Sequence, residues 1–414
     1  MINSTMITND RSSDGVGVRT GADRVAGDRS LLGDLDRRFG LLTNFTGVLA
    51  DLTPTARGLL DAGVRLKALF GPEHGLRGSA QAGGSESHDV DPDTGLPVHD
   101  TYLMSGGLLA ELLDRSGVDV VIVDLQDIGA RFYTYLWSLY DLMVAAARTG
   151  RQVIILDRPN PIGGLRAGGP SLDRSYASFV GRVPMPVRHG LTLGELAGVL
   201  NEHEVPNAAG KPADLSVLTM DGWQRRQTFD QTGLIWVPPS PNIPTVDTAI
   251  SYVGSCLFEG TNVSEGRGTT HPFEIIGAPW IDGRLAAAPH DRRPHGVIAR
   301  DLSFVPTFAK YAGIGCRGIQ LHVVDRERYR PIETTLMIME ELAALYPEFG
   351  LRDLGSGVDN PGEGYALDRL WGSDALRLLI SGRAVGERVD LLALLSDQPD
   401  SPAAWAGDRA LLYP

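Results

Sequence analysis

The feature of this sequence that most constrains the fold is an alternation, from about Phe39 onward, of short apolar runs with amphipathic stretches. The apolar runs, each typical of a buried strand, cover residues 39–43, 66–70, 118–124 and 153–157. The stretches between them, each typical of a helix, cover residues 54–62, 107–115 and 132–148. Continuous apolar runs separated by helices indicate parallel strands that are covered on both faces. The first half therefore predicts a doubly wound, Rossmann-like α/β sheet.

The second half predicts a smaller α/β domain. A helix over 193–201 and strands over 215–219 and 234–237 complete the first domain, and the Pro-rich stretch 238–244 is typical of a boundary loop. The later elements are a strand over 318–324 and helices over 334–345 and 374–379. We therefore expect a Rossmann-like domain over residues 31–243 and a smaller domain over residues 244–414.

The first thirty residues are rich in Ser, Gly, Asp and Arg and contain no apolar run, so we expect residues 1–30 to form a disordered extension. A secretory signal needs roughly 7–15 apolar residues in a row, and a membrane span needs about 20. Neither occurs in the sequence. A cytoplasmic location is the prediction, with export by another route left open.

The charge balance restricts the partners. A formal net charge of −13 disfavours nucleic acid and anionic membrane surfaces, and an acidic substrate would have to be held by local arginines. The two cysteines, Cys256 and Cys316, form neither a metal-binding pair nor a disulfide framework and are expected to be buried. Nothing in the sequence indicates an obligate protein partner.

Polar clusters follow four of the predicted strands. In open α/β sheets ligands bind beyond the carboxyl ends of the strands, so these clusters predict one shared site, although any one of them alone could be a helix cap. The clusters are Thr43-Asn44, residues 71–75, residues 124–127 followed by Arg131, and residues 157–160. The segments 188–190 and 258–270, the latter rich in glycine, fit the same site.

Several familiar signals are absent. There is no G-x-G-x-x-G motif after the first strand, no P-loop and no G-x-S-x-G elbow. A dinucleotide cofactor, a phosphate cradle and a serine nucleophile are therefore not expected, and no cofactor is predicted. His74, Asp124 and Asp127 lack the close ligand spacing of a metal site, so no metal is predicted either.

Six motifs together resemble the exo-acting β-N-acetylmuramidases, the NamZ-type family. They are GPEHGLRG (71–78), DLQDIGARFYTY (124–135), LDRPNP (156–161), RHGLTLGEL (188–196), PSPNIPT (239–245) and EGTNVSEGRGTT (259–270). The resemblance runs from about residue 39 to the C-terminus. One segment departs from it: after residues 96–98, His99-Asp100-Thr101-Tyr102 stands where the family leads us to expect a Ser-Leu-Tyr-Gly-like string.

The resemblance implies a site in a cleft between a Rossmann-like domain and a smaller one. It also implies hydrolysis of β-1,4-linked N-acetylmuramic acid (MurNAc) at the non-reducing end of peptidoglycan fragments, as in cell-wall turnover and recycling. The catalytic glutamate of the family falls on Glu73. If the departing loop lines the sugar pocket, the substrate preference would differ.

Glycoside hydrolysis needs a proton donor and a group that stabilises an oxocarbenium-like centre. Glu73 follows an apolar run, so a partly desolvated position suits it as the acid, with His74 orienting it or positioning water. Asp127, Asp124 and Glu265 remain open as the second carboxylate, and the 2-acetamido group of the substrate could take its place. The expected catalytic residues are Glu73, His74 and Asp127.

The expected substrate-binding residues come from the same motifs. They are Asn44, Asp124, Gln126, Arg131, Tyr133, Asp157, Arg158, Asn160, Arg188, His189, Asn242, Glu265 and Arg267. At least one of the four arginines is expected to bind the lactyl carboxylate of MurNAc, Arg267 first and Arg188 second, because the guanidinium fork matches a carboxylate. For each arginine, pairing with a nearby acid is the plainer alternative.

Two other functions compete with the glycosidase. One is a metal-dependent hydrolase that uses His74, Asp124 and Asp127. The other is a non-catalytic protein whose two α/β domains close on a cell-wall sugar.

Overall fold

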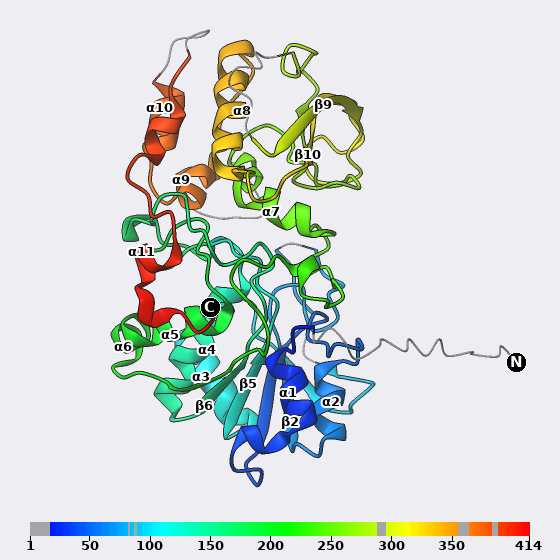
Figure 1. Ribbon diagram of the computed structural model, residues 1–414, viewed down its shortest axis with the longest axis vertical. Helices are drawn as coiled ribbons and strands as arrows, with labels where there is room; N and C mark the ends of the chain where they lie inside the picture. The colour runs from blue at the N-terminus through cyan, green and yellow to red at the C-terminus, as the bar shows by residue number, and fades with distance from the viewer. Residues whose placement is uncertain (1–16, 82, 87–88, 288–294, 355–363, 383–387) are drawn as a thin grey trace, which may run out of the picture.

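The computed structural model describes residues 17–81, 83–86, 89–287, 295–354, 364–382 and 388–414. Within these residues the strands form one seven-stranded sheet and one three-stranded sheet. Figure 1 shows them as two units, with the seven-stranded sheet at the bottom and the three-stranded sheet at the top. The predicted larger and smaller α/β units are both present.

The larger sheet has the strand order β3-β4-β2-β1-β5-β6-β7. Every neighbouring pair is parallel except β3 and β4. Its strands are β1 (Phe39–Thr43), β2 (Leu66–Gly71), β3 (Asp89–Val90), β4 (Pro97–Asp100), β5 (Val120–Asp124), β6 (Gln152–Leu156) and β7 (Asp214–Leu218). The parallel strands, counted along the chain, have the Rossmann order, in which the winding direction reverses between β1 and β5.

Helices cover both faces of this sheet because its central strands are apolar on both sides. Leu41 packs with α1 and α2, whereas the adjacent Leu42 packs with α3, α4 and α5. The helices are α1 (Gly21–Gly27), α2 (Thr55–Asp61), α3 (Gly106–Ser116), α4 (Tyr135–Thr149), α5 (Leu193–Glu202) and α6 (Glu204–Ala209). No helix in the described part of the chain is both long enough and apolar enough to cross a membrane. The doubly wound prediction is confirmed.

The expected disorder of residues 1–30 is wrong for its second half. Helix α1 begins with a capping box, in which Thr20 and Asp23 each accept a hydrogen bond from the other's backbone N–H, at 3.2 and 2.9 Å. Ala22 and Val25 are fully buried against the sheet. The composition of this segment is mostly polar, so two small apolar side chains were not enough to indicate a helix. Residues 1–16 lie outside the described residues.

The smaller sheet is antiparallel, in the order β8-β10-β9. Its strands are β8 (Ile275–Ala278), β9 (Val297–Phe304) and β10 (Cys316–Val323), accompanied by α7 (Val246–Ser255), α8 (Pro331–Leu345), α9 (Ala366–Trp371) and α10 (Ala375–Ser381). Strand β10 and helices α8 and α10 match predicted elements. The strand predicted over 234–237 does not form; Trp236 there packs edge-to-face on Phe229, with ring centroids 4.9 Å apart.

The end of the chain returns to the larger unit, through α11 (Pro402–Ala406). Trp405 donates to the carbonyl of His189 (2.8 Å), and the backbone N–H of Leu412 donates to Glu195 (2.8 Å). Figure 1 shows this segment in red beside α5. The assignment of residues 244–414 to the second domain is therefore wrong for these last residues. The boundary near residue 243 stays a prediction.

Arg131 joins the two units. Its fully buried guanidinium donates to the carbonyls of Pro170 and Met185 in the larger unit, at 2.8 and 2.7 Å. It also donates to the carbonyls of Leu370 and Trp371 at the end of α9, at 2.8 and 3.0 Å. Burial lowers the pKa of Arg131 to about 9. Arg131 was expected to bind substrate; its Nη donors are engaged by backbone carbonyls, and its Nε has no partner among the described residues.

We predict that Arg131→Ala lowers the free energy of unfolding by about 3–5 kcal/mol, since it strips buried carbonyls of their donor. Urea denaturation would measure the loss. The matched control is Arg115→Ala on the exposed side of α3, which should change stability by no more than about 0.5 kcal/mol. Equal stability of the two variants would contradict the joining role.

Candidate active site

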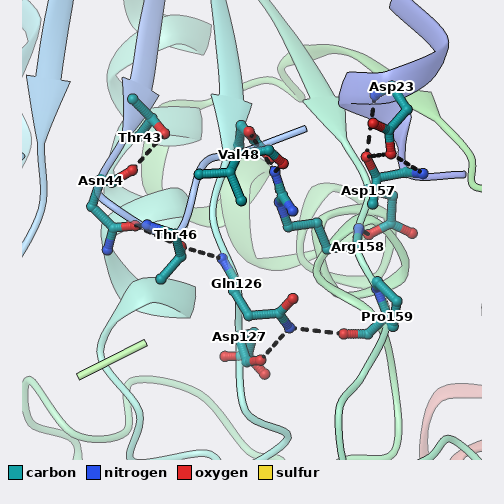
Figure 2. A network of polar contacts seen from close by, with 12 residues as sticks. Asp23, Thr43, Asn44, Thr46, Val48, Gln126, Asp127, Asp157, Arg158 and Pro159 are labelled. Carbon is teal, nitrogen blue, oxygen red and sulfur yellow. Dashed lines mark hydrogen bonds and ion pairs between the residues drawn. The ribbon is translucent and has the colours of Figure 1, made fainter. Parts of the chain in front are cut away.

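The candidate site lies where the winding of the larger sheet reverses. Thr43 at the end of β1 pairs with Asp124 at the end of β5, so the residues after both strands lie side by side. Figure 2 shows how the loops are tied together: Gln126 donates its side-chain amide to the carbonyl of Pro159 (2.9 Å) and its backbone N–H to the Thr46 hydroxyl (3.3 Å). The predicted clusters after β1, β5 and β6 therefore do meet at one edge.

Glu73 follows β2 and is only 7% exposed, as the preceding apolar run predicts. One carboxylate oxygen accepts the backbone N–H of Gly83 (2.7 Å), and the other accepts the hydroxyl of Thr134 (2.5 Å). Thr134 directly precedes α4. Two donors from separate loops thus fix the orientation of this carboxyl group.

His74 has a left-handed backbone, with φ at +71°, an uncommon conformation that clusters at functional sites. Its Nδ1 lies 2.9 Å from the carbonyl of Ala80. Since a carbonyl can only accept, Nδ1 carries a proton, and in the neutral ring Nε2 is the free acceptor. The imidazole packs edge-to-face with Tyr135, with ring centroids 6.5 Å apart.

Two tyrosines attach the Pro-rich loop to the start of α4. The hydroxyls of Tyr133 and Tyr135 both donate to the carbonyl of Pro239, at 2.8 and 2.7 Å, and their rings pack 4.9 Å apart. Burial raises the pKa of both hydroxyls, so both remain protonated donors. Asn242 follows three residues beyond Pro239 and is buried.

Among the asparagines and aspartates predicted for the site, three buried polar atoms have no hydrogen-bond partner within the described residues. They are Nδ2 of Asn44, Oδ1 of Asp127 and Nδ2 of Asn242. Asn44 lies near the hydroxyl of Tyr135, and Asp127 lies near Tyr133. Buried polar atoms are almost always hydrogen-bonded, so the open atoms of Asn44 and Asp127, beside two tyrosines that contact each other, indicate a site for a polar ligand or ordered water.

Asp127 is oriented by His189. Oδ2 of Asp127 accepts the backbone N–H of Gly129 (2.7 Å) and lies 3.2 Å from Nε2 of the fully buried His189. Nδ1 of His189 accepts the backbone N–H of Leu191 (3.2 Å), so in the neutral ring the proton is on Nε2 and is donated to Asp127. This arrangement leaves Oδ1 of Asp127 open.

Asp124 and Arg158, both expected to bind substrate, instead bind each other. Nε and Nη2 of Arg158 donate to the two carboxylate oxygens of Asp124 at 2.5 and 2.8 Å, and Nη2 also donates to the carbonyl of Val48 (2.7 Å). Both side chains are buried. Through these bonds the pair joins the loops after β1, β5 and β6 (Figure 2).

Asp157 and Asn160 are likewise structural. Asp157 is fully buried and accepts from Thr192 (2.7 Å), from the backbone of Gly194 (2.8 Å) and from Tyr413 (2.5 Å). Burial raises its pKa to about 6 although these donors oppose the rise. Asn160 donates to the carbonyl of Leu191 (3.0 Å). Of the four strand-end clusters, the one at residues 157–160 therefore stabilises the fold.

Glu265 and Arg267 form a buried cluster in the second unit. Lys310 donates to Glu265 at 2.8 Å, and Arg267 lies between Glu259 (2.7 Å) and Glu265 (3.6 Å). Burial acts to raise the pKa of Glu265, but the two cations prevail and hold it below its usual value. The arginine also lies over the Phe273 ring, 4.9 Å from its centroid. Arg267 is therefore ion-paired with nearby acids, which is the plainer of the two alternatives given for this arginine.

Metal ligation has no support in this geometry. The three residues of the metal-dependent alternative point to other partners: His74 to a carbonyl, Asp124 to Arg158, and Asp127 to His189. Within the described residues no group of three or more His, Cys, Asp or Glu side chains is placed to hold a metal ion.

The profile of the N-terminal domain of the exo-β-N-acetylmuramidase NamZ matches residues 39–247, and the profile of its C-terminal domain matches residues 250–393. The chain belongs to the NamZ family. The peptidoglycan β-N-acetylmuramidase NamZ of Bacillus subtilis (strain 168) is 41% identical over 369 residues, which cover 88% of this chain and 87% of the relative. The family resemblance of the six motifs is therefore confirmed.

Two crystal structures of DUF1343 family proteins from Bacteroides fragilis NCTC 9343 share the fold. One is 32% identical with a TM-score of 0.81 and covers 97% of this chain and 100% of its own. The other is 29% identical with a TM-score of 0.70 and covers 96% of this chain and 99% of its own. The arrangement of the two units is thus shared across the length of the chain.

Arg188 is a family-motif arginine that is only partly buried and keeps one donor without a partner among the described residues. Its Nη2 donates to the carbonyl of Ile162 (2.6 Å), but its Nε is buried without a partner among the described residues. Burial lowers its pKa to about 10, the neighbouring Arg166 acts in the same direction, and Glu333 of α8 opposes them. Arg131 also has an Nε without a partner among the described residues, but its side chain is fully buried, and Arg158 and Arg267 are paired with acids.

Sequence reasoning missed Thr134, the hydrogen-bond donor to Glu73. Thr134 lies inside the matched segment 124–135, but a threonine before a helix is usually a cap, and nothing local indicated a partner 61 residues away. It also missed Tyr102, which belongs to the departing loop and lies close enough to Glu73 for the carboxylate to act on its hydroxyl.

We predict that Tyr413→Phe destabilises the protein more at about pH 8 than at about pH 5. Asp157 has a folded pKa of about 6 against an ordinary 3.8, so its stabilising contribution is complete at low pH and is lost as pH rises through about 6. The Tyr413 hydroxyl favours the ionised form, so its removal should cost about 1–3 kcal/mol where Asp157 is ionised and less where it is protonated. Urea denaturation at both pH values measures this.

The control for this prediction is Tyr311→Phe. The Tyr311 hydroxyl donates to the neutral carbonyl of Asn262 (2.6 Å), so its loss should be the same at both pH values. A pH-independent loss for Tyr413→Phe would show that the charge of Asp157 is not involved.

Proposed function

We propose that this protein is an exo-acting glycosidase that releases MurNAc from the non-reducing end of peptidoglycan fragments, in cell-wall turnover and recycling. Family membership and the activity in the name of the Bacillus relative support the reaction and the sugar. The observation that carries the proposal is the open oxygen of Asp127 beside Tyr133, together with the buried, oriented Glu73 beside Tyr135.

Glu73 acts as the proton donor to the glycosidic oxygen in this proposal. A leaving sugar alkoxide must be protonated as the bond breaks, and a carboxylic acid in a desolvated, fixed orientation suits that transfer. The backbone of Gly83 and the hydroxyl of Thr134 supply the orientation. His74 lies next to Glu73 in the chain and offers Nε2 toward water or substrate.

Asp127 is the second carboxylate. Of the three residues left open by the sequence, Asp124 is paired with Arg158, and Glu265 is paired with Lys310 and Arg267. Asp127 alone among the three keeps a buried oxygen without a partner in the described residues. His189 donates to its other oxygen, so the open oxygen is held toward whatever occupies the site.

The open atoms match the polar groups of an N-acetylated sugar. Asn44 and Asn242 each offer an N–H donor, and Asp127 offers an acceptor. A 2-acetamido group carries one carbonyl acceptor and one N–H donor, and the ring hydroxyls can do both. Binding such a sugar would satisfy the open groups, each of which otherwise costs about 1–3 kcal/mol as an unsatisfied buried group.

We predict that Glu73→Gln lowers the rate of hydrolysis of a chromogenic MurNAc glycoside by about 10²–10⁴-fold, because glutamine keeps the shape but cannot donate the proton. Thermal unfolding should be close to that of the wild type. The control is Glu111→Gln on the exposed face of α3, which should keep full activity. The assay is repeated after dialysis against a chelator.

Residual activity of Glu73→Gln above a tenth of the wild type would remove Glu73 from the role of acid. Loss on dialysis with recovery on adding Zn²⁺ or Mg²⁺ would favour the metal-dependent alternative. A wild-type chain that binds MurNAc without turnover would be the sugar-binding alternative.

Arg188 is proposed to hold the lactyl carboxylate, in place of the first-ranked Arg267. We predict that Arg188→Ala erases the preference for MurNAc over N-acetylglucosamine glycosides, a loss of about 2–5 kcal/mol on the lactyl-bearing substrate. Kinetics on matched glycosides measure this, with Arg115→Ala as the control. A folded Arg188→Ala enzyme with the wild-type preference would mean that the lactyl group is held elsewhere.

A further inference from the structure

The loop after β4 lies beside Glu73 because of the strand register. Strand β4 pairs with β2 in parallel, and Asp100 lies opposite Gly71. Glu73 and Tyr102 are each two residues beyond this pair, at the same edge of the sheet. The two side chains therefore leave adjacent strand ends, and burial and the Glu73 carboxylate both raise the pKa of the Tyr102 hydroxyl.

Local hydrogen bonds hold this loop in one conformation. Thr101 donates both its backbone N–H and its hydroxyl to the carbonyl of Gly71, at 2.9 and 2.8 Å. The carboxylate of Asp100 accepts the backbone N–H of Tyr102 (2.9 Å) and the hydroxyl of Ser85 (2.5 Å). Leu103, 60% exposed, has a left-handed φ of +57°, which turns the chain sharply after Tyr102.

A second aromatic ring supports Tyr102. Phe179 packs edge-to-face against it, with ring centroids 5.4 Å apart and planes at 77°. Arg182 lies over the Phe179 ring at 5.7 Å and is anchored to Asp141 of α4 by an ion pair of 2.7 Å. Both rings are half-buried, and within the described residues the Tyr102 hydroxyl makes no hydrogen bond.

We propose that Tyr102 and Phe179 form an aromatic wall against which the sugar ring packs beside Glu73, with the Tyr102 hydroxyl bonding a sugar hydroxyl. Sugar rings present C–H groups on their faces, and half-buried aromatic rings with a polar tip suit such a surface. Tyr102 belongs to the one segment where the sequence departs from the expected family string, and Phe179 supports it from outside that segment. This proposal rests on the proposed function, which names the sugar, and it adds the residues that determine how the sugar fits the site.

The test compares Tyr102→Phe, Tyr102→Leu and Phe179→Ala with the wild type, on the chromogenic MurNAc glycoside and in calorimetric binding of MurNAc. We expect Tyr102→Leu and Phe179→Ala each to lower kcat/KM and affinity by about tenfold, mainly through KM, and Tyr102→Phe to lower them by about threefold. Their pH–rate profiles should keep the wild-type shape, because the wall transfers no proton. Thermal unfolding verifies that each variant is folded.

The matched control is Phe308→Ala, which truncates an exposed aromatic ring of the second unit and should change neither quantity. Folded Tyr102→Leu and Phe179→Ala variants with wild-type KM and affinity would overturn the wall, while hydrolysis by the wild type would still support the glycosidase. A wild-type chain that binds MurNAc without hydrolysis, with weaker binding by Tyr102→Leu, would overturn the glycosidase and keep the wall. A wild-type chain that does neither would overturn both.

Discussion

The structure depends on the buried guanidinium of Arg131, whose hydrogen-bond partners are backbone carbonyls. Arg131 donates to four backbone carbonyls, two in each unit, and stays protonated at neutral pH although burial lowers its pKa to about 9. The same residue ends the loop that begins at Asp127, and its backbone N–H donates to the carbonyl of Val187 (2.8 Å). Arg131 lies between Asp127 and Tyr133 in the chain, so the contact that joins the two units also fixes the segment that carries both residues. A planar cation with several donors suits this position, because carbonyls from different directions converge on it.

The acids at the edge of the sheet divide into two kinds according to their hydrogen-bond partners. Asp124 and Asp157 have the donors they need from Arg158, Tyr413 and nearby backbone, so they act as supports. Glu73 and Asp127 are held by donors that orient them, and Asp127 keeps an open oxygen. All four acids lie at or just beyond strand ends, so their place in the sequence does not separate them. In the proposed mechanism, Asp127 differs from the supporting acids by the oxygen that has no partner among the described residues.

The sequence predicted most of the larger sheet because its signals are local. Strand β1 has the predicted limits, and α2, α3 and α4 begin and end within a few residues of the predicted ones. The strand-end rule also found the edge where the site lies. Individual roles could not be predicted, because they depend on partners far away in the chain: Arg158 is 34 residues from Asp124, and Tyr413 is 256 residues from Asp157. Helix α1 was missed because its apolar face is only two small residues in a polar stretch.

The net charge of the chain limits how its arginines can contribute to substrate recognition. A chain of charge −13 repels an anionic substrate at long range, so recognition has to rely on short contacts inside a desolvated site. Most motif arginines are nevertheless used to build the fold: Arg158 and Arg267 neutralise buried acids, and Arg131 binds carbonyls. In the proposed function, selectivity for an acidic sugar then rests on Arg188, on neutral amide donors and on aromatic surface. Such contacts act only at close range, so they stabilise a ligand that fits the site and attract other anions only weakly.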